Sequence, residues 1–157
     1  MDATKGLRTS LNIRQENGLW ADLRIVNDRE KAVFIHNPGD YRPTEGWESS
    51  REAYNVAVLL SFHFLEMTLT REDGIPVNSC GIATRADHIG EPPVALKPHD
   101  VLTISVPLHE YYDLVGGVQY SLELTYRDDK LRVHPKSQFF VARDSESAQN
   151  PQRRLSC

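Results

Sequence analysis

The sequence predicts an all-β protein, and two kinds of observation support this prediction. First, short segments alternate between apolar and polar residues, which is the period of a strand with one buried face. The clearest segments run from Leu7 to Arg14 and from Leu19 to Val26. Second, clusters of turn-forming residues separate the segments, such as Asn17-Gly18 and Glu72-Asp73-Gly74. Short strands at intervals with turns between them are typical of a β-sandwich or a β-barrel.

Further strands are expected along the rest of the chain. The segment from Val56 to Leu65 is almost continuously apolar, so its periodicity does not separate a buried strand from a buried helix. We favour a strand, because the segment leads directly into the predicted hairpin. Ser49 and Glu52 form a potential capping box, which predicts at most a short helical turn near Ser50 to Asn55. The other predicted strands are Ala32 to His36, Ile75 to Val77, Val94 to Leu96, Val101 to Leu108, Val118 to Tyr126, Leu131 to Val133 and Phe139 to Ala142.

The stretch from Leu96 to Leu124 favours the sandwich over the barrel. In its second half, a turn at Gly117 leads Tyr120 into a strand in which Leu122 and Leu124 continue the apolar face. Immunoglobulin-like (Ig-like) sandwiches form their tyrosine corner in this way, with the Tyr hydroxyl bonded to upstream backbone. The sequence therefore predicts a single Ig-like antiparallel β-sandwich with one long loop insertion. The Cys and Trp core of antibody domains is absent, so the likeness concerns architecture only.

Size and charge limit the organisation of the chain and its partners. We expect residues 1–143 to form the sandwich and residues 144–157 to form a disordered tail, because that tail is too polar to pack. The net charge of −4 gives no reason to expect nucleic acid as a partner. No apolar run approaches the length of a membrane span, so no membrane partner is expected.

Cysteine use and the first residues bear on the compartment. Cys80 and Cys157 do not resemble a disulfide framework and are interpreted as two free thiols in a reducing compartment. The first residues lack the apolar region of a secretory signal. We therefore expect a cytoplasmic protein, with a secreted form whose signal has been removed as the alternative.

The same stretch resembles a known domain. It is similar to the non-catalytic Ig-like domain that precedes the catalytic domain in deuterolysin-type metallopeptidases. The segment from Leu23 to Asn27, followed by Val33 and Ile35, looks like the opening hairpin of that domain and of small bacterial intracellular proteinase inhibitors of sandwich type. The resemblance implies a fold and contact with a protease, although function does not follow from fold alone. No catalytic domain follows within this sequence, and the matching residues are Leu96, Pro98, Val106, Leu108, Tyr112, Asp113, Leu114, Gly117 and Tyr120.

No pattern in the sequence indicates catalysis. Cys80 has only Arg85 nearby to lower its thiol pKa, so we interpret it as an incidental thiol. His63 lies in an apolar run and is expected to be a core or edge residue. The His residues do not have the spacing of a zinc site, and we expect no metal, cofactor or catalytic residue, although a site assembled in space stays open as an alternative. The six His residues are His36, His63, His88, His99, His109 and His134.

The longest stretch without a strand pattern runs from Asn37 to Ser50 and is predicted to be a loop. Within it, Tyr41, Arg42 and Trp47 lie among Gly, Pro, Asn and Ser. Aromatic and Arg side chains among adaptable polar residues are typical of binding surfaces, and sandwiches present such loops at their ends. We therefore expect Tyr41, Arg42 and Trp47 to bind a protein partner. The alternative is that Tyr41 and Trp47 fold back as a lid over the core.

These observations predict a non-catalytic protein-binding module. Its sharpest form is an inhibitor or antagonist of a partner enzyme such as a protease. The alternative is a structural or assembly subunit that acts through oligomerisation, by a sheet edge or a loop. An enzyme that uses a metal or a spatial His and Asp cluster is the third hypothesis and ranks last.

Replacing both Tyr41 and Trp47 with Ala separates the two interpretations of the loop. If the loop is a binding surface, the double variant should lose partner capture and keep its melting temperature. If it is a lid, the unfolding free energy should fall by roughly 3 kcal/mol or more, as for large core truncations. A variant that melts early but still captures its partner when folded would contradict the binding role.

Overall fold

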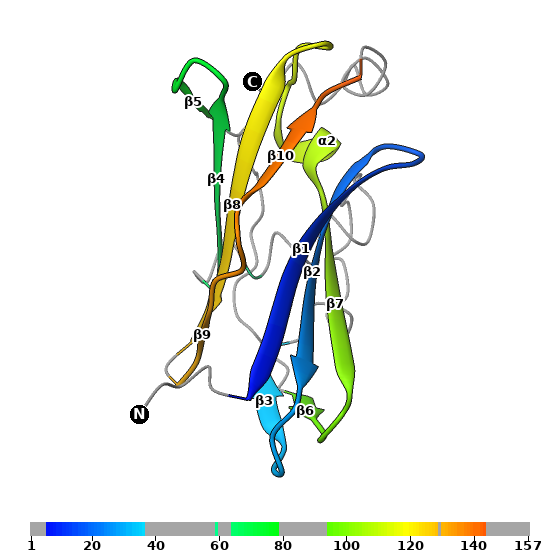
Figure 1. Ribbon diagram of the computed structural model, residues 1–157, viewed down its shortest axis with the longest axis vertical. Coiled ribbons are helices and arrows are strands. Elements are labelled where there is room, and N and C mark those ends of the chain that lie inside the picture. Colours follow the sequence, from blue (N-terminus) through cyan, green and yellow to red (C-terminus); the bar gives the residue numbers. More distant parts are fainter. Residues whose placement is uncertain (1–5, 37–58, 60–63, 79–93, 129, 144–157) are drawn as a thin grey trace, which may run out of the picture.

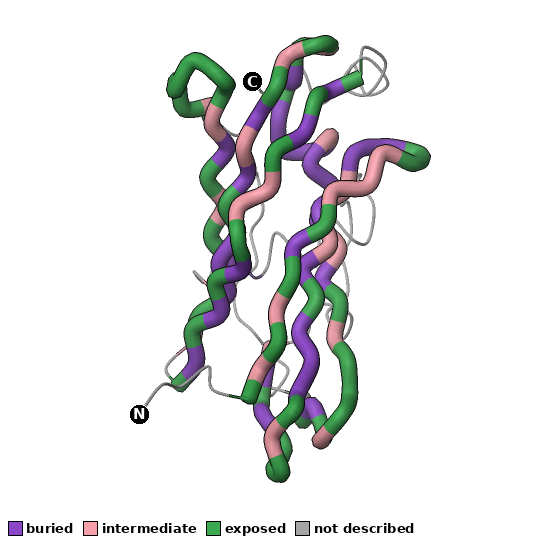
Figure 2. Tube along the Cα trace, viewed as in Figure 1, coloured by how far each residue is buried: buried purple, intermediate pink, exposed green. Residues whose placement is uncertain are grey.

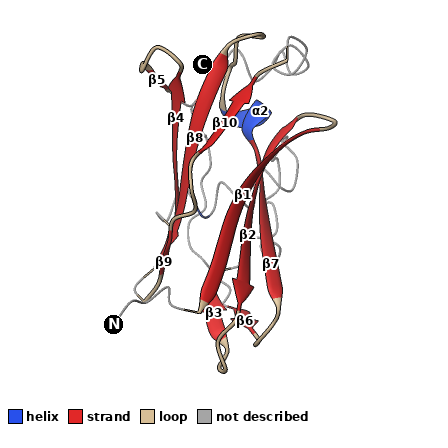
Figure 3. Ribbon diagram, in the orientation of Figure 1, coloured by secondary structure: helices blue, strands red, loops and turns tan. Residues whose placement is uncertain are grey.

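The computed structural model describes residues 6–36, 59, 64–78, 94–128 and 130–143. These residues form antiparallel sheets with almost no helix (Figure 3), as the sequence predicts for an all-β protein. Within the described part of the chain, no helix is long and apolar enough to cross a membrane. The elements are β1 (Leu7–Gln15), β2 (Leu19–Asn27), β3 (Val33–Ile35), β4 (Leu65–Arg71), β5 (Pro76–Val77), β6 (Val94–Leu96), β7 (Val101–Pro107), α2 (Leu108–Tyr111), β8 (Gln119–Arg127), β9 (Arg132–Val133) and β10 (Gln138–Val141).

Two larger sheets lie face to face as layers (Figure 1). One has the strand order β1-β2-β7 and the other the order β10-β8-β4-β5, with β9 also paired to β8. A small third sheet pairs β3 with β6. In Figure 1 this small sheet lies at the end of the layers opposite α2. The two ends of the molecule therefore carry different connections.

The alternation in the sequence explains how the layers pack. In β2, Leu19, Ala21, Leu23 and Ile25 are fully buried, and the polar residues between them face outward. Strand β8 does the same from the opposite layer through Tyr120, Leu122 and Leu124. Figure 2 shows buried and exposed residues alternating along the strands of both layers. The core between the layers consists mainly of Leu, Ile, Val and Tyr side chains, and burying them excludes water and stabilises the fold.

Two details differ from the sequence prediction. The strand expected from Val101 to Leu108 ends at Pro107, and a helical turn, α2, follows it. The prediction of no helix beyond a turn near Ser50 was therefore wrong. Pro107 has no N–H group to extend a ladder, and burial of Leu108 and Tyr111 in the core stabilises the turn. A helix of four residues is too short for periodicity to reveal.

The apolar segment from Val56 to Leu65 also differs from the prediction. Leu59 is helical and fully buried, so the expected strand is wrong at this residue. The Phe64 N–H donates to the Leu59 carbonyl at 2.9 Å, and strand β4 begins only at Leu65. Buried helices and buried strands are both continuously apolar, so the composition did not separate them. The remainder of this segment, the predicted Ser50 to Asn55 turn and the predicted tail lie outside the described residues.

The tyrosine contact predicted from the sequence is present. The side chain of Tyr120 is only 2% exposed, and its hydroxyl accepts a hydrogen bond of 2.9 Å from the Val115 N–H. Its ring stacks on Phe140 of the neighbouring strand, with 5.8 Å between ring centroids. Gly117 in the intervening turn has a φ of 83°, a conformation that favours glycine. The contact fixes the chain between α2 and β8.

We expect Tyr120→Phe to lower the unfolding free energy by about 1 kcal/mol, because it deletes one hydrogen bond and keeps the buried ring. Denaturant unfolding of the variant and the wild type measures the difference. An unchanged midpoint would mean that the hydroxyl contributes nothing to this turn.

Candidate functional site

The residues predicted to bind a partner, Tyr41, Arg42 and Trp47, lie outside the described residues. The same holds for Cys80, Arg85, Asp87 and for His63 and His88. The other four His residues are distributed over the described part and do not converge. His99 is exposed, His134 bonds to Thr125, His109 contacts β2, and His36 lines a pocket. Among the described residues, no group of three or more His, Cys, Asp or Glu side chains is placed to hold a metal ion.

The pocket at His36 has a volume of about 540 Å³. It opens where the turn between β2 and β3, strand β3, Phe64 and the turn after β8 come together. This is the end of the layers that carries β3 and β6 (Figure 1). We call it the end pocket. Among the described residues, its apolar lining consists of Ala32, Val33, Phe34, Phe64 and Leu131, and its polar lining consists of Arg29, His36, Asp128 and Lys130.

A chain of hydrogen bonds holds one wall of the end pocket. The backbone N–H of His36 donates to the Tyr126 hydroxyl at 2.9 Å, and that hydroxyl donates to Asp128 Oδ2 at 2.9 Å. The other oxygen of Asp128 accepts the N–H groups of Lys130 and Leu131, each at 2.8 Å. Tyr126 is fully buried, so this chain joins the end of β3 to the turn after β8 through the interior.

Asn27 holds the opposite wall. Its side chain is fully buried, and its amide Nδ2 donates to the carbonyl groups of Lys31 and Leu96, at 2.9 and 2.8 Å. Its Oδ1 accepts the Arg29 N–H at 2.9 Å. Buried amides require such partners because losing them costs the full desolvation penalty. The hydrogen bonds therefore fix the turn between β2 and β3 and place Arg29 at the pocket.

Aromatic rings complete the lining. The imidazole of His36 stacks on Phe64, with 4.1 Å between ring centroids and an angle of 18° between the planes. Phe34 points to the other side of β3 from the buried Val33 and Ile35 and is 61% exposed. Its ring extends the apolar lining of the end pocket toward the solvent, and binding sites are lined mainly by such apolar and aromatic side chains.

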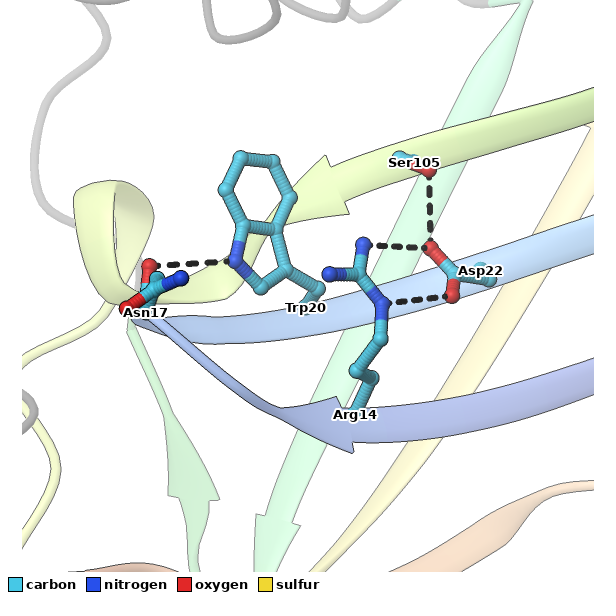
Figure 4. Close-up of polar contacts among 5 residues, drawn as sticks. All are labelled: Arg14, Asn17, Trp20, Asp22 and Ser105. Carbon is cyan, nitrogen blue, oxygen red and sulfur yellow. Dashed lines mark hydrogen bonds and ion pairs between the residues drawn. The ribbon is translucent and has the colours of Figure 1, made fainter.

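A second cluster lies on the outer face of the β1-β2-β7 sheet (Figure 4). Arg14 Nε donates to Asp22 Oδ2 at 3.1 Å, and the Ser105 hydroxyl donates to Asp22 Oδ1 at 2.8 Å. The hydrogen bond between Arg14 and Asp22 raises the pKa of the Arg14 guanidinium above its usual value. The Arg14 guanidinium carbon lies 5.3 Å from the centre of the Trp20 ring, and Trp20 Nε1 donates to the Asn17 carbonyl at 3.4 Å. The cluster orders an Arg and a Trp side chain on a sheet face.

His109 of α2 supports this cluster from the edge. Its ring meets Trp20 at an angle of 69°, with 5.3 Å between centroids, and its Nδ1 lies 3.1 Å from both the backbone nitrogen and the carbonyl oxygen of Leu19. Gly18 faces the same ring, and a Cβ atom at this position would lie 2.5 Å from His109 Cε1. Only a glycine therefore lets the turn between β1 and β2 approach α2 this closely.

Comparisons with known proteins add no relative to these observations. No protein-family model matches the sequence, and no curated protein matches it.

The residues that build both sites were not predicted from the sequence. The alternating pattern places Arg14 and Trp20 in strands and His36 at a strand end, but it assigns none of them to a surface cluster. The register across strands brings Arg14 opposite Trp20, and Asp22 opposite Ser105. For the end pocket, the sequence offered one signal, a polar turn followed by a short strand in which an aromatic residue points outward. The turn begins with Asn27, Asp28 and Arg29, and the aromatic residue is Phe34.

We expect Gly18→Ala to destabilise the protein more than the control Gly74→Ala. Both glycines have a positive φ, of 120° and 85°, which costs an alanine about 1–2 kcal/mol. Nothing lies within 4 Å of a Cβ at Gly74, whereas at Gly18 the clash with His109 should add about 1–3 kcal/mol. Thermal or denaturant unfolding measures the difference. Adding His109→Ala to Gly18→Ala should recover part of the loss, and an absence of recovery would contradict the clash.

Proposed function

We propose that this protein is a non-catalytic protein-binding module with an Ig-like sandwich. The strand orders support the fold assignment. The β1-β2-β7 sheet corresponds to strands A, B and E of an Ig domain, and β10-β8-β4-β5 corresponds to G, F, C and an added strand. In this correspondence, Tyr120 starts strand F and bonds to the preceding turn, as the Tyr of a tyrosine corner does.

The observation that carries the binding function is the position of the end pocket. In the Ig correspondence, the connection from β2 to β4 is the B–C loop and the connection from β8 to β10 is the F–G loop. Antibody variable domains bind through these loops, which lie at one end of the sandwich. His36 and Phe64 belong to the first connection, and Asp128 and Lys130 belong to the second. The end pocket thus lies between the two connections that this class of domain uses for recognition.

The partner we propose is a protein, and the sharpest form is an enzyme, such as a protease, that the module antagonises in a reducing compartment. Phe34 at the rim of the end pocket offers an exposed aromatic side chain on a short, hydrogen-bonded strand. Interfaces gain most of their energy from a few such anchors. Tyr41, Arg42 and Trp47 belong by sequence to the same connection between β2 and β4 and would extend the surface.

A specific observation favours a second function, that of an assembly subunit. Phe139 and Val141 on β10 are 69% and 51% exposed. Strand β10 lies at the edge of its sheet, beside β8. Exposed apolar residues at a sheet edge promote association with another chain. A mass in solution above the 17.9 kDa of one chain that returns to 17.9 kDa in a Phe139→Ala variant would support assembly through this edge.

Replacing Phe34 with Ala tests the binding function, with Phe139→Ala as the matched control. We expect Phe34→Ala to weaken the capture of the partner by about tenfold, which is within the range of aromatic anchors, and Phe139→Ala to leave it unchanged. Neither variant should change the unfolding free energy by more than about 0.5 kcal/mol, because both side chains are exposed.

The measurement is affinity capture from the source cell, with mass spectrometry to identify the partner and titration of the purified pair. Where the partner is an enzyme, its rate with and without the module tests antagonism. Equal capture by wild type and Phe34→Ala would contradict binding through this end. Loss of capture by the Phe139 variant alone would move the interface to the β10 edge.

A further inference from the structure

We propose that the end pocket recognises an apolar residue next to an acidic residue in a peptide segment of the partner. The proposal rests on the proposed binding function and names the chemistry of its ligand. It is carried by the combination of apolar walls and cationic side chains in one pocket.

The apolar walls fit one large side chain of the ligand. Phe34, Phe64 and Leu131 provide two aromatic rings and one aliphatic side chain around the opening. A volume of about 540 Å³ lies within the usual range of about 300–1,000 Å³ for ligand pockets, so it accommodates a Phe or Leu side chain together with part of its neighbours. Removing both surfaces from water drives this contact.

The charged side chains of the end pocket favour an acidic residue next to the apolar residue of the ligand. Among the described lining residues, Arg29 and Lys130 contribute two positive charges and Asp128 contributes one negative charge, which leaves a balance of +1. The chain as a whole has a net charge of −4, so the described part of the lining has the opposite sign. A local field of this sign attracts a carboxylate.

Asp128 does not cancel this selectivity, because its carboxylate is already engaged. Its two oxygens accept three hydrogen bonds, from the Tyr126 hydroxyl and from the N–H groups of Lys130 and Leu131. These donors partly compensate its charge. Lys130 is exposed, and the described residues offer its ammonium group no salt bridge. It is therefore the side chain best placed to meet a carboxylate of the ligand.

The pocket is also held in place before binding. The Tyr126 and Asn27 hydrogen bonds fix its two walls from buried positions. Walls that do not need to be ordered on binding cost less free energy, so a short segment is sufficient for measurable affinity.

Matched synthetic peptides test the proposal on the full chain. The first has the sequence Gly-Gly-Phe-Glu-Gly-Gly, acetylated and amidated at its ends, and the second has Gln in place of Glu. We expect calorimetry or NMR titration to show the Glu peptide binding about fivefold more tightly, which corresponds to about 1 kcal/mol. A third peptide with Ala in place of Phe should bind at least as weakly as the Gln peptide. Raising the salt concentration should reduce the preference for Glu, because exposed charges are screened.

Variants assign the preference to the pocket. Lys130→Gln should remove most of the preference for Glu over Gln, and the control Lys136→Gln, at an exposed lysine outside the pocket lining, should keep it. Phe34→Ala should weaken the binding of all three peptides.

The inference would be overturned by no binding of the Glu peptide at millimolar concentration, by equal binding of the Glu and Gln peptides, or by an unchanged preference in Lys130→Gln. A preference that appears only when the peptide has a free terminal carboxylate would overturn it too, because it would assign recognition to a chain end. If partner capture depends on Phe34 but not on Lys130, the binding function stands and this inference fails.

Discussion

The buried side chain of Asn27 holds together the part of the molecule on which the end pocket depends. Its amide binds the turn before β3 and the carbonyl of Leu96 in β6. Its backbone binds the segment before β7, where the His99 N–H donates to the Asn27 carbonyl at 2.6 Å. His99 adopts a φ of 71° to make this contact. Because a buried amide without partners is costly, these segments are fixed together.

The two ends of the layers differ in the contacts that hold their connections in place. At the α2 end, Gly18, His109 and Tyr120 close the connections tightly, and the contacts are mainly structural. At the β3 end, the Tyr126 hydroxyl and Asp128 keep the layers joined at a place where a pocket remains. Hydrogen bonds replace part of the apolar packing there. Their directionality maintains the shape of a cavity, which apolar packing would tend to fill.

The outer face of the β1-β2-β7 sheet shows how a solvent-facing surface becomes ordered. Arg14, Trp20 and Asp22 are polar or amphipathic residues at outward positions, which is the ordinary pattern for a half-buried sheet. Their cross-strand positions turn this pattern into contacts between a guanidinium, an indole and a carboxylate. Each such pair contributes modestly, by roughly 0.2–1 kcal/mol. The cluster therefore shapes the surface more than it determines stability.

Strand positions and most turns were predictable because they depend on local patterns. The alternation from Leu7 to Arg14, the Asn17-Gly18 turn and the hairpin at Gly74 follow from side-chain direction and from backbone conformations that glycine allows. The Tyr120 contact was predictable for the same reason, since only five residues separate its two partners. Helix α2 was missed, because a four-residue turn depends on burial of Leu108 and Tyr111 by strands distant in the sequence.

The sequence by itself determined the all-β class, the succession of most strands along the chain and the face that β1, β2 and β8 bury, because these follow from a period of two and from turn chemistry. The tertiary structure alone decided which strands became neighbours and which side chains met. His36 and Tyr126 are 90 residues apart, and Leu19 and His109 are also separated by 90 residues. No local pattern encodes such contacts, since they form only when segments distant in the sequence pack together. The end pocket combines such contacts with local hydrogen bonds, such as those from the N–H groups of Lys130 and Leu131 to Asp128.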